Sequence, residues 1–141
     1  LMYPGARALV ARKTSTALSG SAMVTFREDI LRAEEGVVYF GGNRIKPAAF
    51  HYPNGSELVI NGLDKPEKVK STAFDIALIN EATECAIEDI EFVRSRLRHG
   101  KLPYHQLIMD VNPDAPTHWL NQRMYEGSTT RLVSRHQDNP S

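Results

Sequence analysis

Short apolar runs alternate along this chain with longer amphipathic segments. Two of the runs, Phe74–Ile79 and Gln106–Val111, lack a strict apolar–polar alternation, which is typical of strands buried on both faces of a sheet. A third run follows Pro4-Gly5, and a fourth lies close to the last residue. Outside any hairpin, the pattern therefore predicts four strands: Ala6–Arg12, Phe74–Ile79, Gln106–Val111 and Thr130–Ser134.

Three amphipathic segments lie between these runs, and each predicts a helix. The first begins at the hydroxyl caps Thr14–Thr16 and ends near Gly36, the second follows Glu84, and the third is capped by Thr117 and ends at Gly127. Their apolar faces are Leu18, Ala22, Phe26, Ile30 and Ala33 in the first, Ile87, Ile90, Val93 and Leu97 in the second, and Trp119, Leu120 and Met124 in the third.

The middle of the chain predicts a β-hairpin. Two β-rich segments, Ala49–Tyr52 and Glu57–Ile60, flank the turn Pro53–Ser56, which contains an Asn-Gly pair. Strands that alternate with helices elsewhere indicate βαβ units. We therefore expect an α/β fold with a mainly parallel sheet, and an antiparallel hairpin inserted into it.

Composition narrows the class of protein. The chain has 141 residues, 17 Lys+Arg and 17 Asp+Glu, so no global field attracts it to nucleic acid, and any such contact would use a local patch. No apolar run approaches the roughly 20 residues that span a bilayer. A single cysteine, Cys85, excludes a disulfide framework and a cysteine-based zinc site, and we expect it to be a buried apolar residue.

The two ends indicate a piece of a longer protein. The chain begins at Leu1 without an initiator methionine, and it stops at Ser141 directly after a strand-like segment. It has no leader with a charged and then an apolar part, so we expect no signal peptide and no secretion.

Candidate chemistry lies where the predicted strands end, because parallel sheets gather functional residues at the carboxyl ends of their strands. Polar residues follow three strands: Arg12–Thr14, Asn80-Glu81 and Asp110–Pro113. If the second and third of these strands are neighbours, Glu81 and Asn112 lie close together. A carboxylate there can activate a water or help to hold Mg²⁺, and an amide can position a phosphate or a water.

Other interpretations of the same residues stay open. An acidic residue after a strand is common, and an Asn-Pro pair is usually only a turn. Three arginines late in the second helix can face phosphate or can simply complement the helix dipole: Arg94, Arg96 and Arg98. A metal-dependent phosphodiesterase would instead require a converging set of metal ligands: Glu81, Asp110, Asp114 and His118.

The order of the segments resembles the ATPase domain of phage terminase large subunits, the motors that package double-stranded DNA. Tyr3–Arg7 through Thr14 resembles the second strand of that domain, and Leu78–Glu84 resembles its Walker B strand. The remaining stretches that carry the resemblance are Phe50–Asp64 with Lys68 and Ser71, Arg94–Arg98, Asp110–Pro113, His118–Leu120 and His136–Pro140.

The resemblance implies a RecA-like P-loop NTPase core of the ASCE class, with helices on both faces of the sheet and with ATP and Mg²⁺ as cofactors. Glu81 matches the glutamate that activates the attacking water. Asn80 stands where many P-loop ATPases have a Mg²⁺-binding aspartate, so Mg²⁺ binding is expected to be weaker. Asn112 and Pro113 match the segment that couples hydrolysis to motion, and the three arginines match a site that acts on phosphate or on a neighbouring subunit.

No Gly-x-x-x-x-Gly-Lys-Ser/Thr phosphate loop occurs in the sequence. The resemblance places that loop and the first strand upstream of Ala6, and a nuclease domain downstream of Ser141. We therefore expect residues 1–141 to be a partial ATPase domain that is inactive alone. The implied partners are double-stranded DNA, the portal protein, the small terminase subunit and further copies in a ring on the procapsid, in the host cytoplasm and without a membrane. The alternative function is a non-catalytic DNA- or protein-binding remnant of a prophage protein.

Overall fold

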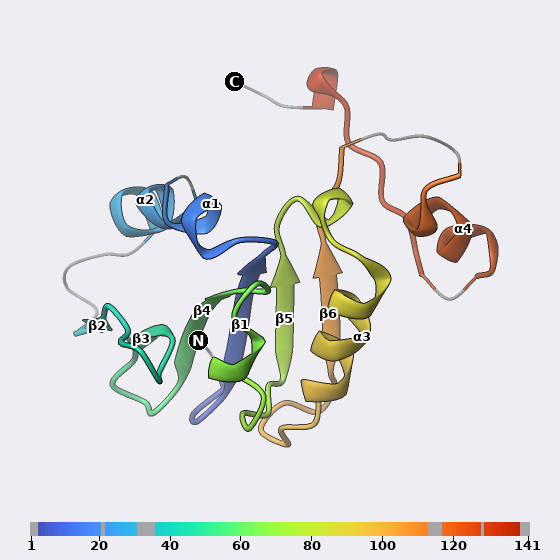
Figure 1. Ribbon diagram of the computed structural model, residues 1–141. Coiled ribbons are helices and arrows are strands. Elements are labelled where there is room, and N and C mark those ends of the chain that lie inside the picture. Colours follow the sequence, from blue (N-terminus) through green and yellow to red (C-terminus); the bar gives the residue numbers. More distant parts are fainter. Residues whose placement is uncertain (1–2, 21, 31–35, 113–116, 128, 139–141) are drawn as a thin grey trace.

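A six-stranded sheet in the order β2-β3-β4-β1-β5-β6 forms the centre of the computed structural model (Figure 1). The structure describes residues 3–20, 22–30, 36–112, 117–127 and 129–138. Strands β4, β1, β5 and β6 are parallel to one another, whereas β2 and β3 are antiparallel to their neighbours. The strands are β1 Arg7–Arg12, β2 Val38–Phe40, β3 Ala48–His51, β4 Glu57–Gly62, β5 Ile76–Ile79 and β6 Gln106–Met109.

The predicted hairpin is confirmed. Strands β3 and β4 pair with Phe50 opposite Leu58, and the turn between them includes Gly55 at a φ of 83°, a backbone conformation that glycine adopts without strain. Asn54 accepts a hydrogen bond from the Ser56 N–H within the turn. Strand β2 was not predicted. It contains three exposed residues and pairs with β3 alone, so its conformation depends on an antiparallel partner rather than on burial.

Helices cover both faces of the sheet, as expected. On β4, Leu58 and Ile60 point to one face and Val59 points to the other, following the two-residue repeat of a strand. Leu18 of α1 packs with the first pair, and Ile90 of α3 packs on the opposite face with Val59. The helices are α1 Ser15–Gly20, α2 Ala22–Thr25, a π-helical turn Phe26–Ile30, α3 Ile87–Arg96 and α4 Trp119–Tyr125, with 3-10 turns at Pro66–Lys68, Ala82–Glu84 and His136–Asp138.

The predicted strand Thr130–Ser134 is wrong. Residues 129–135 form no strand or helix, and the side chains of Leu132 and Val133 are 92% and 63% exposed. No neighbouring strand supplies backbone partners to this segment, and a strand needs them more than it needs β-rich residues.

The predicted helices are shortened or shifted. The single helix expected from Thr14 to Gly36 is divided into α1, α2 and the π-helical turn, and residues 31–35 lie outside the described part. The N-cap of α4 is His118 rather than Thr117, because the His118 side chain accepts a hydrogen bond from the Leu120 N–H. No helix among the described residues is both long enough and apolar enough to span a membrane.

One carboxylate, Asp75, is buried at the amino edge of the sheet, next to the start of β5. It is 1% exposed and accepts hydrogen bonds from four groups: the His99 ring at 2.7 Å and the backbone N–H groups of Arg7, Lys101 and Leu102 at 2.9 to 3.1 Å. Burial alone would raise the pKa of Asp75, but these hydrogen bonds outweigh burial and lower the pKa to about 2. The charge therefore fixes the loop that leads from α3 into β6.

Candidate active site at the carboxyl edge of the sheet

Strands β1, β5 and β6 end at the same edge of the sheet, with β5 in the middle (Figure 1). This edge carries Arg12 after β1, Asn80 and Glu81 after β5, and Asp110 to Asn112 after β6. The Asn80 N–H donates to the Ala11 carbonyl at 2.8 Å, and the Asp110 N–H donates to the Ile79 carbonyl at 3.1 Å. The backbone hydrogen bonds that pair these three strands therefore continue past the strand ends, and they fix the backbone of the site.

The backbone of Glu81 has a left-handed conformation, with φ and ψ both at 53°. Among the described residues, Glu81 is the single non-glycine residue with a positive φ. Asp110 from the neighbouring strand holds this turn twice: its Oδ1 accepts from the Glu81 N–H at 2.7 Å, and its carbonyl accepts from the Ala82 N–H at 3.0 Å. The turn that presents the Glu81 carboxylate thus depends on contacts from β6.

The side chain of Asn80 binds the same aspartate. Its Nδ2 donates to Asp110 Oδ2 at 2.7 Å. The two oxygens of the Asp110 carboxylate therefore accept from two consecutive residues of the β5 end. The sequence places Asp110 at a strand end with candidate chemistry and gives it a role only in the phosphodiesterase hypothesis, so this contact was missed. The available signal was an acidic residue at the end of the strand next to that of Glu81.

Glu81 and Asn112 are brought together, as the sequence predicted for neighbouring strands. Asn112 Nδ2 donates to Glu81 Oε2 at 3.2 Å. Glu81 itself forms no ion pair with any described residue, although it accepts this hydrogen bond. An unpaired carboxylate that is oriented through one oxygen can use the other oxygen to accept a proton or to bind a water.

The cations of this edge are paired with other acids. Arg12 forms two hydrogen bonds with the Glu84 carboxylate, at 3.0 and 3.2 Å, which raise the pKa of Arg12 and lower that of Glu84. Lys13 contacts Asp89 at 2.7 Å, and this hydrogen bond raises the Lys13 pKa. Glu84 and Asp89 therefore neutralise the nearby cations and leave Glu81 available for chemistry.

Helix α4 is attached to the segment that follows Glu81. Since His118 Nδ1 accepts from the Leu120 N–H, the proton is on Nε2, which donates to the Thr83 carbonyl at 3.2 Å. Trp119 Nε1 donates to the Cys85 carbonyl at 3.0 Å. Burial raises the pKa of the Cys85 thiol to about 11, which fits a small apolar core residue.

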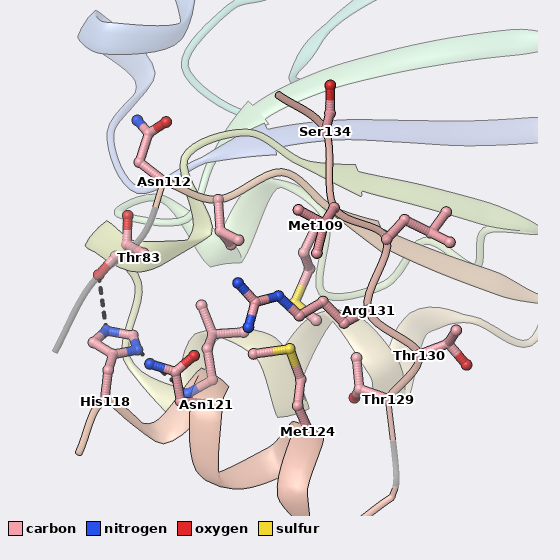
Figure 2. Close-up of a pocket in the computed structure, with 14 residues that line it drawn as sticks. Thr83, Met109, Asn112, His118, Asn121, Met124, Thr129, Thr130, Arg131 and Ser134 are labelled. Atoms are coloured by element: carbon pink, nitrogen blue, oxygen red, sulfur yellow. Dashed lines mark hydrogen bonds between the residues drawn. The ribbon is translucent and has the colours of Figure 1, made fainter. Parts of the chain in front are cut away.

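A cavity of about 170 Å³ lies between β6, α4 and the segment 129–134 (Figure 2). Asn112, His118 and Arg131 are among its lining residues, and Figure 2 shows the Arg131 guanidinium turned into it. The volume is below the roughly 300–1,000 Å³ of typical ligand pockets, and Glu81 does not line it. We therefore assign it no nucleotide.

The three candidate arginines lie at the opposite edge of the sheet from Glu81. The Arg96 carbonyl accepts from the N–H of Phe74, which precedes β5, whereas Glu81 follows β5. Arg94 pairs with Glu91 at 3.1 Å, the Arg96 guanidinium donates to the Lys70 carbonyl, and Arg98 is exposed. These arginines therefore do not join Glu81 in one site within this chain.

The ligand set of the phosphodiesterase hypothesis is not assembled by the described residues. They contain no group of three or more His, Cys, Asp or Glu side chains that could hold a metal. His118 caps α4, and Asp110 is engaged by Asn80 and Glu81. Pro113 and Asp114 lie outside the described residues.

Comparison with known proteins adds to this geometry. Residues 1–139 match the family model described as phage terminase large subunit. The PBSX phage terminase large subunit of Bacillus subtilis (strain 168) is 29% identical over 119 residues, which are 84% of this chain and 27% of that protein. The chain thus spans about a quarter of the length of this curated relative.

Solved structures with a similar fold come from the same class of protein. The large terminase of a thermophilic bacteriophage, in complex with ATP-gamma-S, has a TM-score of 0.67 and 13% identity over 99% of this chain and 34% of that chain. The large terminase ATPase domain of Thermus phage P74-26 has a TM-score of 0.53 and 16% identity over 79% of this chain and 49% of that chain. The expected RecA-like fold is therefore confirmed, and the chain belongs to the phage terminase large subunit family.

Proposed function

We propose that this chain supplies the hydrolytic residues of a terminase ATPase, the motor that drives double-stranded DNA into procapsids. One observation carries the proposal: Glu81 follows the central strand of the site, forms no ion pair with the described residues, and is oriented by Asn112. Family membership supports the same function, and a solved relative of similar fold binds ATP-gamma-S.

In this proposal, Glu81 is the general base for hydrolysis. Its carboxylate accepts a proton from the water that attacks the γ-phosphate, while the hydrogen bond from Asn112 keeps one oxygen fixed. Phosphoryl transfer depends mainly on positioning and electrostatics, so a fixed carboxylate is the contribution expected from the protein at this point. Asn112 and Pro113 would then couple the hydrolytic state to motion.

The residues at this edge fit a Mg²⁺ ion. Mg²⁺ in nucleotide sites usually binds one or two protein oxygens together with phosphate oxygens and waters. The Asn80 amide supplies such an oxygen at the end of β5, since its Nδ2 is turned toward Asp110, and Asn80 is the residue that would hold the ion. When bound, Mg²⁺ neutralises charge on the phosphates of ATP. The remaining phosphate contacts would come from a phosphate loop elsewhere in the complete subunit.

Family membership is the support for a proposal about the wider assembly. We propose that the complete subunit acts on double-stranded DNA in the host cytoplasm, in a homo-oligomeric ring with the portal protein and the small terminase subunit. Arg94, Arg96 and Arg98 lie away from Glu81 of their own chain, so a role at phosphates would be on a neighbouring subunit.

The substitution Glu81→Gln in the complete subunit tests the proposal. It removes the base while keeping the size and the hydrogen-bonding oxygen of the side chain, so ATP hydrolysis should fall by about 10²–10⁴-fold while ATP binding stays nearly unchanged. Phosphate release and binding of a fluorescent ATP analogue measure the two quantities. The exposed Glu88→Gln on α3 is the matched control and should keep its activity. Near-normal turnover by Glu81→Gln would move the role to another acid, first of all Glu84.

A further inference from the structure

We infer that Asp110 is a positioning residue of the ATPase site, which sets both the backbone of Glu81 and the orientation of the Asn80 amide. The inference rests on the proposed function of Glu81. Asp110 accepts from the Glu81 N–H and from Asn80 Nδ2, each at 2.7 Å, through its two different carboxylate oxygens. Asp110 comes from the end of β6, the strand next to β5, which carries Asn80 and Glu81 at its end.

The contact with Glu81 fixes a conformation that the residue does not prefer. A left-handed glutamate needs compensating contacts from its surroundings. The charged acceptor Asp110 Oδ1 binds the Glu81 N–H, and hydrogen bonds to charged groups are stronger than those between neutral groups. Loss of this acceptor therefore releases the turn and displaces the Glu81 carboxylate from its place beside Asn112.

The contact with Asn80 decides which end of its amide faces the site. An ionised carboxylate only accepts hydrogen bonds, so the Asn80 NH₂ group must face Asp110 and its Oδ1 must face away. Oδ1 is the atom of this side chain that Mg²⁺ can bind, since the ion takes oxygen ligands. Asp110 thereby allows the neutral Asn80 to offer an oxygen to Mg²⁺. A carboxylate at position 80 would offer an oxygen in either orientation.

A purely structural role would give a different pattern of effects. Asp110 is exposed, so its hydrogen bonds replace bonds to water and contribute little to global stability. Its substitution should therefore change the site more than the melting temperature.

The test compares Asp110→Asn with the exchange of the two side chains in the complete subunit. In Asp110→Asn, the new side chain can accept from the Glu81 N–H only through its amide oxygen. Its NH₂ group then faces the NH₂ group of Asn80, and these two donors cannot form a hydrogen bond with each other. To restore a hydrogen bond, Asn80 must rotate and withdraw Oδ1 from the site. We expect kcat to fall by about tenfold or more and the Mg²⁺ concentration for half-maximal activity to rise by a similar factor.

The double variant Asn80→Asp with Asp110→Asn restores the pairing with its polarity reversed. The carboxylate at position 80 then accepts from the amide at position 110, and its second oxygen faces the site. In this double variant, we expect kcat and the Mg²⁺ requirement to return to within about threefold of the original values. The reason is that substitutions of two residues in direct contact have non-additive effects in a double-mutant cycle. Asn80→Asp alone places two carboxylates together and should be worse than the double variant.

A second readout does not depend on turnover. The affinity for a fluorescent ATP analogue is measured with and without Mg²⁺, and Asp110→Asn should reduce only the gain that Mg²⁺ provides. The control is Glu67→Gln, which removes an exposed carboxylate from the 3-10 turn Pro66–Lys68. It should leave both readouts unchanged.

The outcomes separate the inference from the proposed function. If Glu81→Gln is inactive while Asp110→Asn matches the original protein, the inference is overturned and the proposed function stands. If Asp110→Asn mainly lowers the melting temperature and the double variant recovers nothing, Asp110 is only a structural residue. If Glu81→Gln keeps its activity, there is no catalytic carboxylate for Asp110 to position, and both ideas fail.

Discussion

Asp75 shows how one residue ties the amino edge of the sheet together. It is nearly fully buried and charged, a combination that is stable only when its hydrogen bonds are satisfied. Three backbone N–H groups and His99 provide those bonds, which connect the starts of β1 and β5 to the loop before β6. The Asp75 carboxylate therefore holds the starts of β1 and β5 in place. The opposite ends of these two strands carry the candidate site.

The Asp75 carboxylate should make stability sensitive to acid. Its pKa is about 2 in the folded protein against an ordinary value of 3.8, so the ionised form favours folding. That stabilisation, about 2 kcal/mol from the size of the shift, is present above about pH 4 and is lost as the pH falls toward 2. Asp75→Asn should lower the free energy of unfolding at neutral pH by roughly 1–3 kcal/mol and flatten this part of the pH profile.

Denaturant unfolding between pH 2 and pH 7 measures this effect. The exposed Glu67→Gln serves as a control for the loss of one carboxylate. Equal pH profiles for Asp75→Asn and the original protein would show that Asp75 has no special part in stability.

At the scale of elements, two routes connect the site to α4. Asn112 leads from β6 into the segment before the helix, while His118 and Trp119 of the helix start bind the carbonyls of Thr83 and Cys85. The segment that follows Glu81 is therefore linked to the start of α4 by two hydrogen bonds.

Asn112→Ala in the complete subunit tests whether the first route couples hydrolysis to motion. The variant loses the hydrogen bond to Glu81 but no buried group, so folding and ATP affinity should persist. DNA-stimulated hydrolysis or translocation should fall by about tenfold or more. A lower melting temperature together with normal packaging per ATP would instead make Asn112 a simple turn residue.

The central elements of the fold could be predicted because their residues are buried from both sides. Leu9, Ala77 and Ile79 form apolar runs that only a covered sheet accommodates, and the Asn54-Gly55 pair specifies the hairpin. The nearness of Glu81 and Asn112 follows from the order of these strands.

The parts of the fold and of the site that could not be predicted depend on contacts that leave no local pattern in the sequence. Strand β2 forms because β3 offers it a partner, whereas residues 130–134 stay irregular because no strand among the described residues pairs with them. The link from Asp110 to the Glu81 N–H joins residues 29 positions apart and involves a backbone atom, which any amino acid would supply. The position of Asp110 at a strand end is readable from the sequence, but this particular contact is not.

At the scale of the molecule, one edge of the sheet stays open. Strand β6 pairs with β5, and no described strand lies on its other side. Ile108 of this strand is 44% exposed, so the expected burial of Gln106–Val111 on both faces is wrong for β6. The chain spans about a quarter of its curated relative, so we expect further parts of a complete subunit to cover this edge.

An incomplete site predicts that the 141-residue chain alone hydrolyses no ATP. It contains Glu81, the base of our proposal, but its sequence has no phosphate-loop motif to bind the triphosphate. Phosphate release by the purified chain should equal that of its Glu81→Ala variant. Steady turnover above this control would contradict the prediction.

The left-handed backbone at Glu81 has a consequence for engineering this chain. If folding alone were selected, glycine would be favoured at this position by about 1 kcal/mol or more, with asparagine or aspartate as the next choices. This chain has a glutamate there instead, at the position where we propose that the catalytic base lies, and activity and stability often favour different residues at such positions. Thermostability design applied to this chain should therefore leave position 81 unchanged, because a substitution that relieves the backbone there would remove the carboxylate of the proposed base.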